Sequence, residues 1–265
     1  MGEMTSVYES FDKSSLIERT LAVMEQGYRA VKLVNIPYTH YTASLGNLKK
    51  LEAGMLALRE AVGDEVEIMV DFHGRCSSVS AALQYIDAIA PARPMFAEEP
   101  VGPGDAQAMA MIAARSPVPI ATGERLVDRL EFDALFRLRA VHIAQPDLCH
   151  VGGFTEAKKI ASAAETAGAA VAPHNPLGPL AGVAALHFAV ATPNFLIQEE
   201  MVGAVPWYRE VMDNPIVMKD GHWQVPSLPG LGVEVHETIA DSHPFEQEIF
   251  HTRHAQMGDG TVVDW

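Results

Sequence analysis

The amino-acid sequence predicts an α/β protein built as a TIM-like (β/α)7β barrel. About eight short apolar runs alternate along the chain with helix-forming segments, which is the pattern of parallel strands joined by crossover helices. The length of 265 residues suits one such barrel. An open doubly wound sheet is the alternative, but no Gly-x-Gly-x-x-Gly follows the first run, which disfavours its dinucleotide-binding form.

The expected elements follow one another from residue 5 to about residue 200. Strands are expected at 5–10, 28–34, 66–71, 94–98, 118–122, 141–144, 169–173 and 194–199, and helices at about 15–26, 45–62, 81–89, 105–114, 130–138, 154–167 and 180–190. The first helix is predicted to open with a capping box at Ser15 and Glu18 and to end at Gly27. Residues 201–265 are rich in Pro, Gly and His, and they predict a loop-bearing tail with one short ribbon around 222–235.

Composition limits the classes of function. The chain carries 34 acidic and 19 basic residues, a formal net charge of −15, which argues against nucleic acid or an anionic membrane as the partner. Two cysteines, Cys76 and Cys149, are too few for a disulfide framework. No apolar run approaches the ~18 residues of a membrane span, and no secretory signal opens the sequence. These observations predict a location in the reducing cytoplasm.

Three acidic residues close successive strands. Asp71, Glu98 and Glu124 each follow an apolar run at its carboxyl end, which is the end where barrels hold their active sites. Their carboxylates are expected to converge and, since like charges repel, to require a cation. All-oxygen ligation favours Mg²⁺ first and Mn²⁺ next. The alternative is that one or more of these residues caps a following helix.

A possible acid–base pair lies on the two strands that follow. Asp147 and His174 each end an apolar run before a Gly- or Pro-rich turn. A buried Asp fixes a neighbouring His in one tautomer and raises its basicity, which makes a general base. Taken singly, each residue is better explained structurally, Asp147 as a helix cap and His174 as a packed core histidine.

Other polar residues lie at the same end of the predicted barrel. His73 comes two residues after Asp71, so it shares the same face if the strand continues, and it is then suited to act as an acid opposite His174. Glu199 closes the last strand. Lys32, near the end of the second strand, is suited to hold a substrate carboxylate or to act as a base with a lowered pKa, or else is a solvated strand-end residue. The pattern does not decide the role of His150.

Six motifs carry a resemblance to a known family. They are Asp71-Phe-His-Gly-Arg75, Phe96-Ala-Glu-Glu-Pro100, Ala121-Thr-Gly-Glu-Arg125, Gln145-Pro-Asp-Leu-Cys-His-Val-Gly-Gly-Phe-Thr-Glu156, Ala172-Pro-His-Asn-Pro-Leu-Gly-Pro179 and Pro229-Gly-Leu-Gly-Val-Glu234. Together they resemble the enolase superfamily, and within it the mandelate racemase subgroup. The first and fifth motifs resemble its sugar-acid dehydratase branch.

The resemblance implies a role for each matching position. It implies that Asp71, Glu98 and Glu124 are Mg²⁺ ligands, and that His174 is the general base with Asp147 as its partner. It also implies that His73 is the acid for the departing hydroxyl, that Glu199 lies by the substrate carboxylate and that Lys32 binds substrate. Val34 replaces the second Lys of the Lys-x-Lys motif found in racemases, which disfavours a mandelate-type racemase.

The implied reaction is Mg²⁺-dependent dehydration of a sugar acid to a 2-keto-3-deoxy acid, with galactonate as the favoured substrate. Dehydration of another aldonate such as gluconate, or epimerisation at C2, is the alternative. Family members begin with an α+β capping domain, whereas this sequence opens at or just before the first barrel strand. We therefore expect one barrel domain over residues 1–265, either as a fragment or as a capless barrel with impaired catalysis. The resemblance also implies a homo-oligomer.

Overall fold

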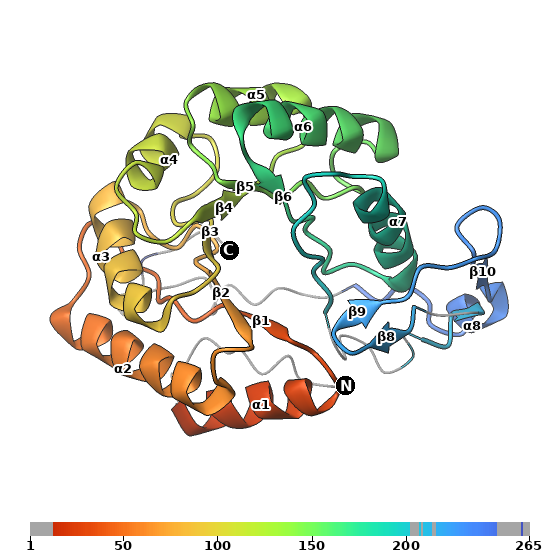
Figure 1. Cartoon of the computed structure of the whole chain (residues 1–265), viewed down its shortest axis with the longest axis horizontal. Helices are drawn as coiled ribbons and strands as arrows, with labels where there is room; N and C mark the ends of the chain where they lie inside the picture. Colours follow the sequence, from red (N-terminus) through yellow and green to blue (C-terminus); the bar gives the residue numbers. More distant parts are fainter. Residues whose placement is uncertain (1–12, 202–206, 208, 214–215, 248–260, 262–265) are drawn as a thin grey trace.

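The backbone forms a ring of parallel strands surrounded by helices (Figure 1). The computed structural model describes residues 13–201, 207, 209–213, 216–247 and 261. Six strands form one parallel sheet in sequence order: β1 (Ala30–Leu33), β2 (Glu67–Asp71), β3 (Phe96–Glu98), β4 (Ile120–Thr122), β5 (Ile143–Ala144) and β6 (Ala170–Val171). They match the second to seventh predicted strands. The first predicted strand, 5–10, lies outside the described residues.

The segment predicted as the last strand pairs at one residue only. Val171 forms a parallel bridge with Phe195, supported by hydrogen bonds from Val171 N to Asn194 O and from Leu196 N to Val171 O. The next ladder bond would need the N–H of residue 173, which is Pro173 and has none. The prediction of a full strand over 194–199 is therefore wrong, although the chain does run beside β6.

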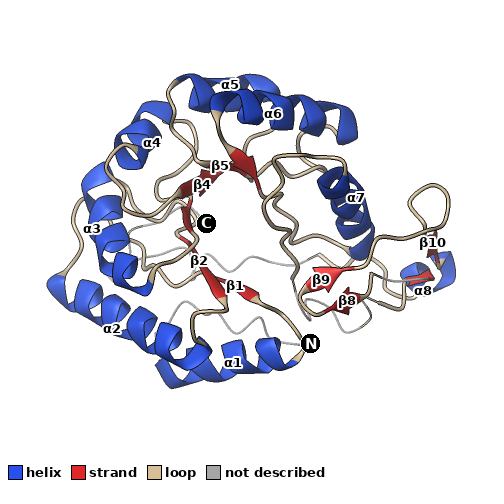
Figure 2. Cartoon of the chain, viewed as in Figure 1, coloured by secondary structure: helices blue, strands red, loops and turns tan. Residues whose placement is uncertain are grey.

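Seven helices connect the strands and cover the outer side of the ring (Figure 2). They are α1 (Lys13–Glu25), α2 (Leu45–Val62), α3 (Val79–Ile89), α4 (Ala106–Ala113), α5 (Arg129–Arg137), α6 (Phe154–Ala167) and α7 (Pro179–Val190), with a 3-10 turn η1 (Ala90–Ala92) after α3. Helix α1 begins before Ser15, so the predicted capping box at that residue is wrong. A capping box instead opens α5, where Asp128 and Glu131 bond to each other's backbone N–H groups.

Two apolar clusters divide the core of the barrel. The larger cluster packs the outer side of the sheet against the helices. The smaller one fills the inside of the ring with Met69, Phe96, Ala121, Ile143 and Ala172, one residue from each of five consecutive strand segments. Side chains alternate between the two faces of a strand. The residue two positions after each of these five therefore also points into the ring, closer to the carboxyl end of its strand. The carboxyl ends of the strands therefore present polar side chains to one common space.

The tail contains two short ribbons where the sequence predicted one. Strand β7 (Met212–Asp213) pairs with β10 (Glu234–Val235), β8 (Met218–Lys219) pairs with β9 (His222–Trp223), and a short helix α8 (Glu237–Asp241) follows. Asp220 and Gly221, between β8 and β9, both have positive φ, of 51° and 76°, as a tight two-residue hairpin turn requires. Apolar tail residues pack against Val183 of α7, so the tail lies beside this helix (Figure 1).

Glu200 joins this tail to the barrel. Its Oε2 accepts hydrogen bonds from Tyr28 Oη, at 2.5 Å, and from Trp223 Nε1, at 3.0 Å. Tyr28 precedes β1 and Trp223 ends β9, so one carboxylate connects three distant parts of the sequence. Hydrogen bonds to an ionised group are stronger than those between neutral groups.

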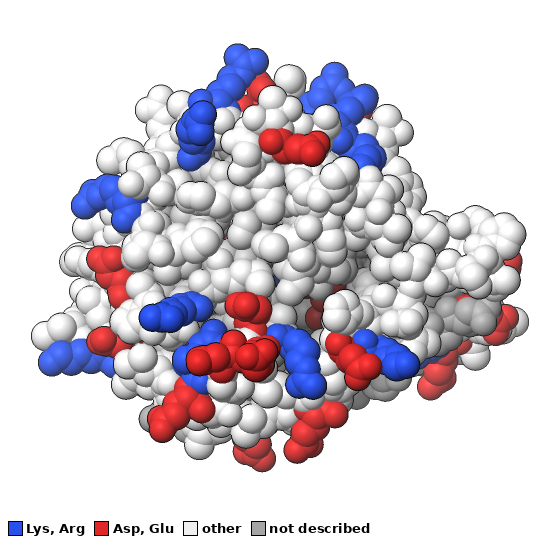
Figure 3. Space-filling view, viewed as in Figure 1, with Lys and Arg blue, Asp and Glu red and all other residues white. Residues whose placement is uncertain are grey.

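On the face seen in Figure 3, Lys and Arg side chains lie between Asp and Glu side chains, mainly around the rim and the lower half.

Among the described residues, we find no helix whose length and apolar character would let it cross a membrane.

Replacing Tyr28 by Phe should destabilise the fold, because it removes the hydroxyl that binds Glu200. We expect a loss of about 1 kcal/mol and a Tm lower by about 2–4 °C in thermal unfolding. Tyr41→Phe is the matched control, since Tyr41 is 74% exposed. Equal Tm values for the two variants would contradict this role of Glu200.

Candidate active site

The polar residues singled out in the sequence meet at the carboxyl end of the barrel. Asp71 and Glu98 are the last residues of β2 and β3, and Glu124, Asp147 and His174 lie in the loops after β4, β5 and β6. All four carboxylates have 5% of their surface exposed or less. The barrel therefore concentrates buried acidic groups at one point.

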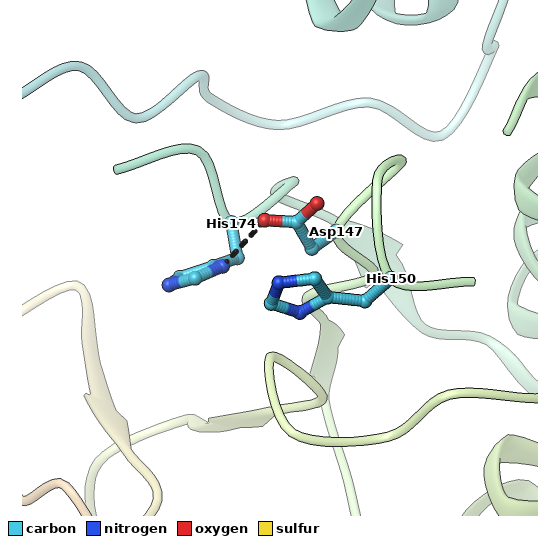
Figure 4. Close-up of side chains that lie close together, drawn as sticks. All are labelled: Asp147, His150 and His174. Atoms are coloured by element: carbon cyan, nitrogen blue, oxygen red, sulfur yellow. Dashed lines mark hydrogen bonds and ion pairs between the residues drawn. The ribbon is translucent and has the colours of Figure 1, made fainter. Parts of the chain in front are cut away.

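Asp147 and His174 form a hydrogen-bonded pair. His174 Nδ1 lies 2.8 Å from Asp147 Oδ2, and the other carboxylate oxygen accepts the backbone N–H of Cys149 at 2.7 Å (Figure 4). Burial would raise the pKa of Asp147, but the hydrogen bonds from His174 and Cys149 lower it below its usual value. An ionised Asp147 can only accept a hydrogen bond, so Nδ1 of His174 carries the hydrogen and the lone pair of the neutral imidazole is at Nε2.

Glu124 lies between two histidines. His174 Nε2 is 3.4 Å from Glu124 Oε2, and His73 Nδ1 is 3.4 Å from Glu124 Oε1. The preceding Gly123 has a φ of 143°, and a Cβ there would approach the Phe132 ring to 2.7 Å. A glycine is needed at this turn because any side chain would displace it, and with it the Glu124 carboxylate.

His73 reaches the site by a turn and not by continuation of the strand. Strand β2 ends at Asp71, and His73 has a φ of 50° in the left-handed region. Its backbone N–H donates to Asp71 Oδ1 at 2.7 Å, and its Nδ1 lies 3.7 Å from Asp71 Oδ2. His73 lies beside Asp71, as the sequence analysis predicted. The strand period of two used in that prediction is not the cause, because the strand has already ended.

Lys32 is surrounded by carboxylates. Its Nζ lies 2.9 Å from Glu98 Oε2, 2.6 Å from Glu199 Oε1 and 4.0 Å from Asp71 Oδ2. Burial favours the neutral amine, but the charges of Glu98, Glu199 and Asp71 outweigh it and raise the pKa of Lys32 well above its usual value. The suggestion that Lys32 is a base with a lowered pKa is therefore wrong, because its carboxylate neighbours raise the pKa and favour the charged form.

Glu199 is held from two sides. One oxygen binds Lys32, and the other accepts the backbone N–H of Asn175 at 2.8 Å, while Asn175 Nδ2 donates to the Glu199 backbone oxygen at 3.1 Å. The sequence analysis did not single out Asn175. The one feature of the sequence that could have identified Asn175 is its position directly after His174 in the Pro-His-Asn-Pro turn.

The ion pair between Arg125 and Glu99 was also missed. Arg125 lies 2.8 Å from the oxygen of Glu99, which is almost fully buried. Both residues directly follow predicted site residues, Glu98 and Glu124. Adjacent acidic or basic residues are common in loops, so sequence alone did not mark this pair.

The charges of the site fit a divalent cation. Ligand atoms of Asp71, His73 and Glu124 lie within 4.8 Å of one another. Burial, followed by the charges of Glu99, Asp71 and Glu98, raises the pKa of Glu124 to about 9, and burial raises the pKa of Glu98 to about 7. Lys32 alone does not offset these acids, and carboxylate oxygens are ligands that Mg²⁺ prefers. Glu98 itself contacts Lys32 and is not part of the group within 4.8 Å.

Comparison with known proteins identifies the family. The family described as enolase C-terminal domain-like matches residues 15–239. The chain therefore belongs to this family, and the resemblance to the enolase superfamily is confirmed.

Individual relatives agree with this assignment. D-galactonate dehydratase of Ralstonia pickettii is 37% identical over 221 residues, which cover 80% of this chain and 57% of the relative. D-galactonate dehydratase of Pectobacterium atrosepticum is 36% identical over 231 residues, covering 83% and 60%. The chain thus spans less than two thirds of the length of these curated relatives.

A solved structure gives the same result for the fold. The mandelate racemase/muconate lactonizing enzyme from Sulfitobacter sp. superposes with a TM-score of 0.84 at 35% identity, covering 92% of this chain and 62% of that one. The predicted fold class, an enolase-type α/β barrel, is confirmed.

The raised pKa of Glu124 predicts how stability depends on pH in chelator-treated protein. A carboxyl whose pKa is about 9 in the folded state and 4.5 in the unfolded state stabilises the fold fully below pH 4.5, and this stabilisation is lost as the pH rises towards 9. We expect Tm to fall between pH 5 and pH 9, and to fall less in Glu124→Gln. Added Mg²⁺ should raise Tm more at pH 9 than at pH 5, because protons compete for the carboxylates. Equal pH profiles in the two proteins would contradict this assignment.

Proposed function

We propose that this barrel carries out Mg²⁺-dependent dehydration of a sugar acid, with galactonate favoured, to a 2-keto-3-deoxy acid. The observation that carries the proposal is the His174–Asp147 pair, in which His174 Nε2 lies 3.4 Å from Glu124 Oε2 at the cluster of buried carboxylates. The names of the dehydratase relatives support the reaction class and suggest galactonate as the first substrate.

The proposed metal ligands are Asp71, Glu98 and Glu124. When bound, Mg²⁺ would supply Lewis-acid stabilisation of the negative charge that develops on the substrate carboxylate as the α-proton leaves. Lys32 is proposed to bind the substrate carboxylate, and its raised pKa keeps it charged for this purpose. Glu199, held by Lys32 and Asn175, would lie beside the same carboxylate.

His174 is the proposed general base. Asp147 holds its Nδ1–H, so Nε2 can take the proton from the carbon next to the carboxylate. As the proton moves to Nε2, the ring becomes cationic and the charge of Asp147 stabilises it.

His73 is the proposed acid. Its Nδ1 lies 3.4 Å from Glu124 Oε1, so an N–H there is held by a carboxylate. His73 would protonate the departing 3-hydroxyl, which leaves as water. The C2–C3 enol that results tautomerises to the 2-keto-3-deoxy acid, so the reaction needs no other reactant.

An activity screen tests the proposed function. The purified chain should convert at least one aldonic acid in a panel, galactonate first, to a product detected as a 2-keto-3-deoxy acid. In His174→Ala, kcat should fall about a hundredfold to ten-thousandfold, because a general base contributes that much. No turnover of any acid by folded, Mg²⁺-loaded protein would sink the proposal for this chain alone, and an epimer as the product would replace dehydration by epimerisation.

Removal of the metal should abolish turnover without unfolding the barrel. We expect EDTA to stop product formation and excess Mg²⁺ or Mn²⁺ to restore it, since both ions accept oxygen ligands. Circular dichroism provides the control for folding. Full activity in EDTA would exclude the proposed role of Asp71, Glu98 and Glu124.

A further inference from the structure

His150 lies beside the His174–Asp147 pair, and the proposed mechanism does not use it. It follows Asp147 by three residues in the loop after β5. Its ring centroid is 5.9 Å from that of His174, with an angle of 44° between the rings. One ring nitrogen lies within 4.8 Å of ligand atoms of both Asp147 and His174.

One hydrogen bond fixes the tautomer of His150. Its Nδ1 lies 2.9 Å from the backbone oxygen of Glu124. A carbonyl oxygen can only accept, so Nδ1 must carry the hydrogen. In the neutral ring, Nε2 then has the lone pair and is a hydrogen-bond acceptor.

The acceptor nitrogen points into the site. Figure 4 shows the ring edge that carries Nε2 turned towards His174 and Asp147. We find no hydrogen bond to Nε2 among the described residues, and the side chain is exposed, whereas Asp147 is buried and His174 is partly buried. His150 therefore offers an accessible acceptor nitrogen directly beside the proposed base.

The neighbouring groups leave a distinct task for such an acceptor. Asp71, Glu98 and Glu124 are proposed to face the metal, and Lys32 the carboxylate end of the substrate. A polyhydroxy acid also carries neutral hydroxyls along its chain. When the acid binds, each hydroxyl gives up its hydrogen bonds to solvent water and needs an acceptor in the protein. A neutral nitrogen accepts from a hydroxyl without adding another negative charge to an already acidic site.

We propose that His150 is a further substrate-binding residue, whose Nε2 accepts a hydrogen bond from a hydroxyl of the sugar acid bound beside His174. This inference rests on the proposed function. It adds a residue that helps to choose among sugar acids by the position of their hydroxyls, because a site built to bind a hydroxyl rejects analogues that lack it.

Two variants separate the two nitrogens of His150. The amide of Asn is placed like Nδ1, so His150→Asn keeps a donor to the Glu124 oxygen and loses the acceptor at Nε2. The amide of Gln reaches the place of Nε2, so His150→Gln keeps an acceptor and loses the bond to Glu124. Each variant is assayed for kcat and KM at pH 8 with Mg²⁺, and for Tm.

We expect His150→Asn to raise KM about threefold to tenfold, the effect of one hydrogen bond, with little change in kcat or Tm. The KM of His150→Gln should lie at least threefold closer to the wild-type value, while its Tm falls. A panel of deoxy aldonic acids provides a second readout. Wild-type protein should discriminate against one analogue, and His150→Asn should lose that discrimination.

Three results would overturn the inference. An unchanged KM in His150→Asn would show that the acceptor binds nothing. A defect in His150→Gln alone would show that the residue only fixes the Glu124 loop, and a fall in kcat at constant KM would make it a support for the His174 ring. If wild-type protein neither binds nor converts any sugar acid, the proposed function fails together with this inference, and calorimetric titration with galactonate distinguishes that case.

Discussion

The rest of the site depends on the crowding of buried carboxylates around one cation, the ammonium group of Lys32. Glu98 and Glu199 bind it directly and Asp71 lies at 4.0 Å. The charge of Lys32 does not offset the burial and the neighbouring acids that raise the pKa of Glu124 to about 9. Buried charges are tolerated only when they are compensated. A second cation would compensate the remaining charge, and the proposed Mg²⁺ chemistry follows from that requirement.

The parallel sheet explains why these charges meet at all. The register pairs Asp71 with Glu98, and the inner apolar cluster fills the ring beneath them. Each crossover helix brings the chain back to the end of the sheet where the strands begin. All strands of this sheet therefore run in the same direction, and their last residues lie together at the other end. The topology therefore brings like charges together at a cost in folding free energy. Burial of the inner apolar cluster and of the outer helices stabilises the fold and offsets this cost.

Sequence reasoning predicted that these polar residues meet at one end of the barrel, because strand ends in a barrel share one face. It found Asp71, Glu98 and the His174–Asp147 contact from local patterns alone. It did not find the support of Glu199 by Asn175 or the Glu99–Arg125 pair, because contacts between different loops leave no periodic signal. The truncated last strand was missed because the effect of Pro173 depends on which partner its N–H would have had.

The turns after β2, β3 and β4 show how local backbone conformation positions the side chains of the site. His73, Glu99 and Gly123 follow these strands with φ values of 50°, 40° and 143°. A left-handed non-glycine residue costs about 1–3 kcal/mol, and it persists only where its surroundings fix it. His73 is fixed by Asp71 Oδ1 and Glu99 by Arg125. Asp71 and Glu99, a proposed metal ligand and the direct neighbour of another, therefore take part in the contacts that hold these strained turns, and the first of the turns places His73 against Glu124.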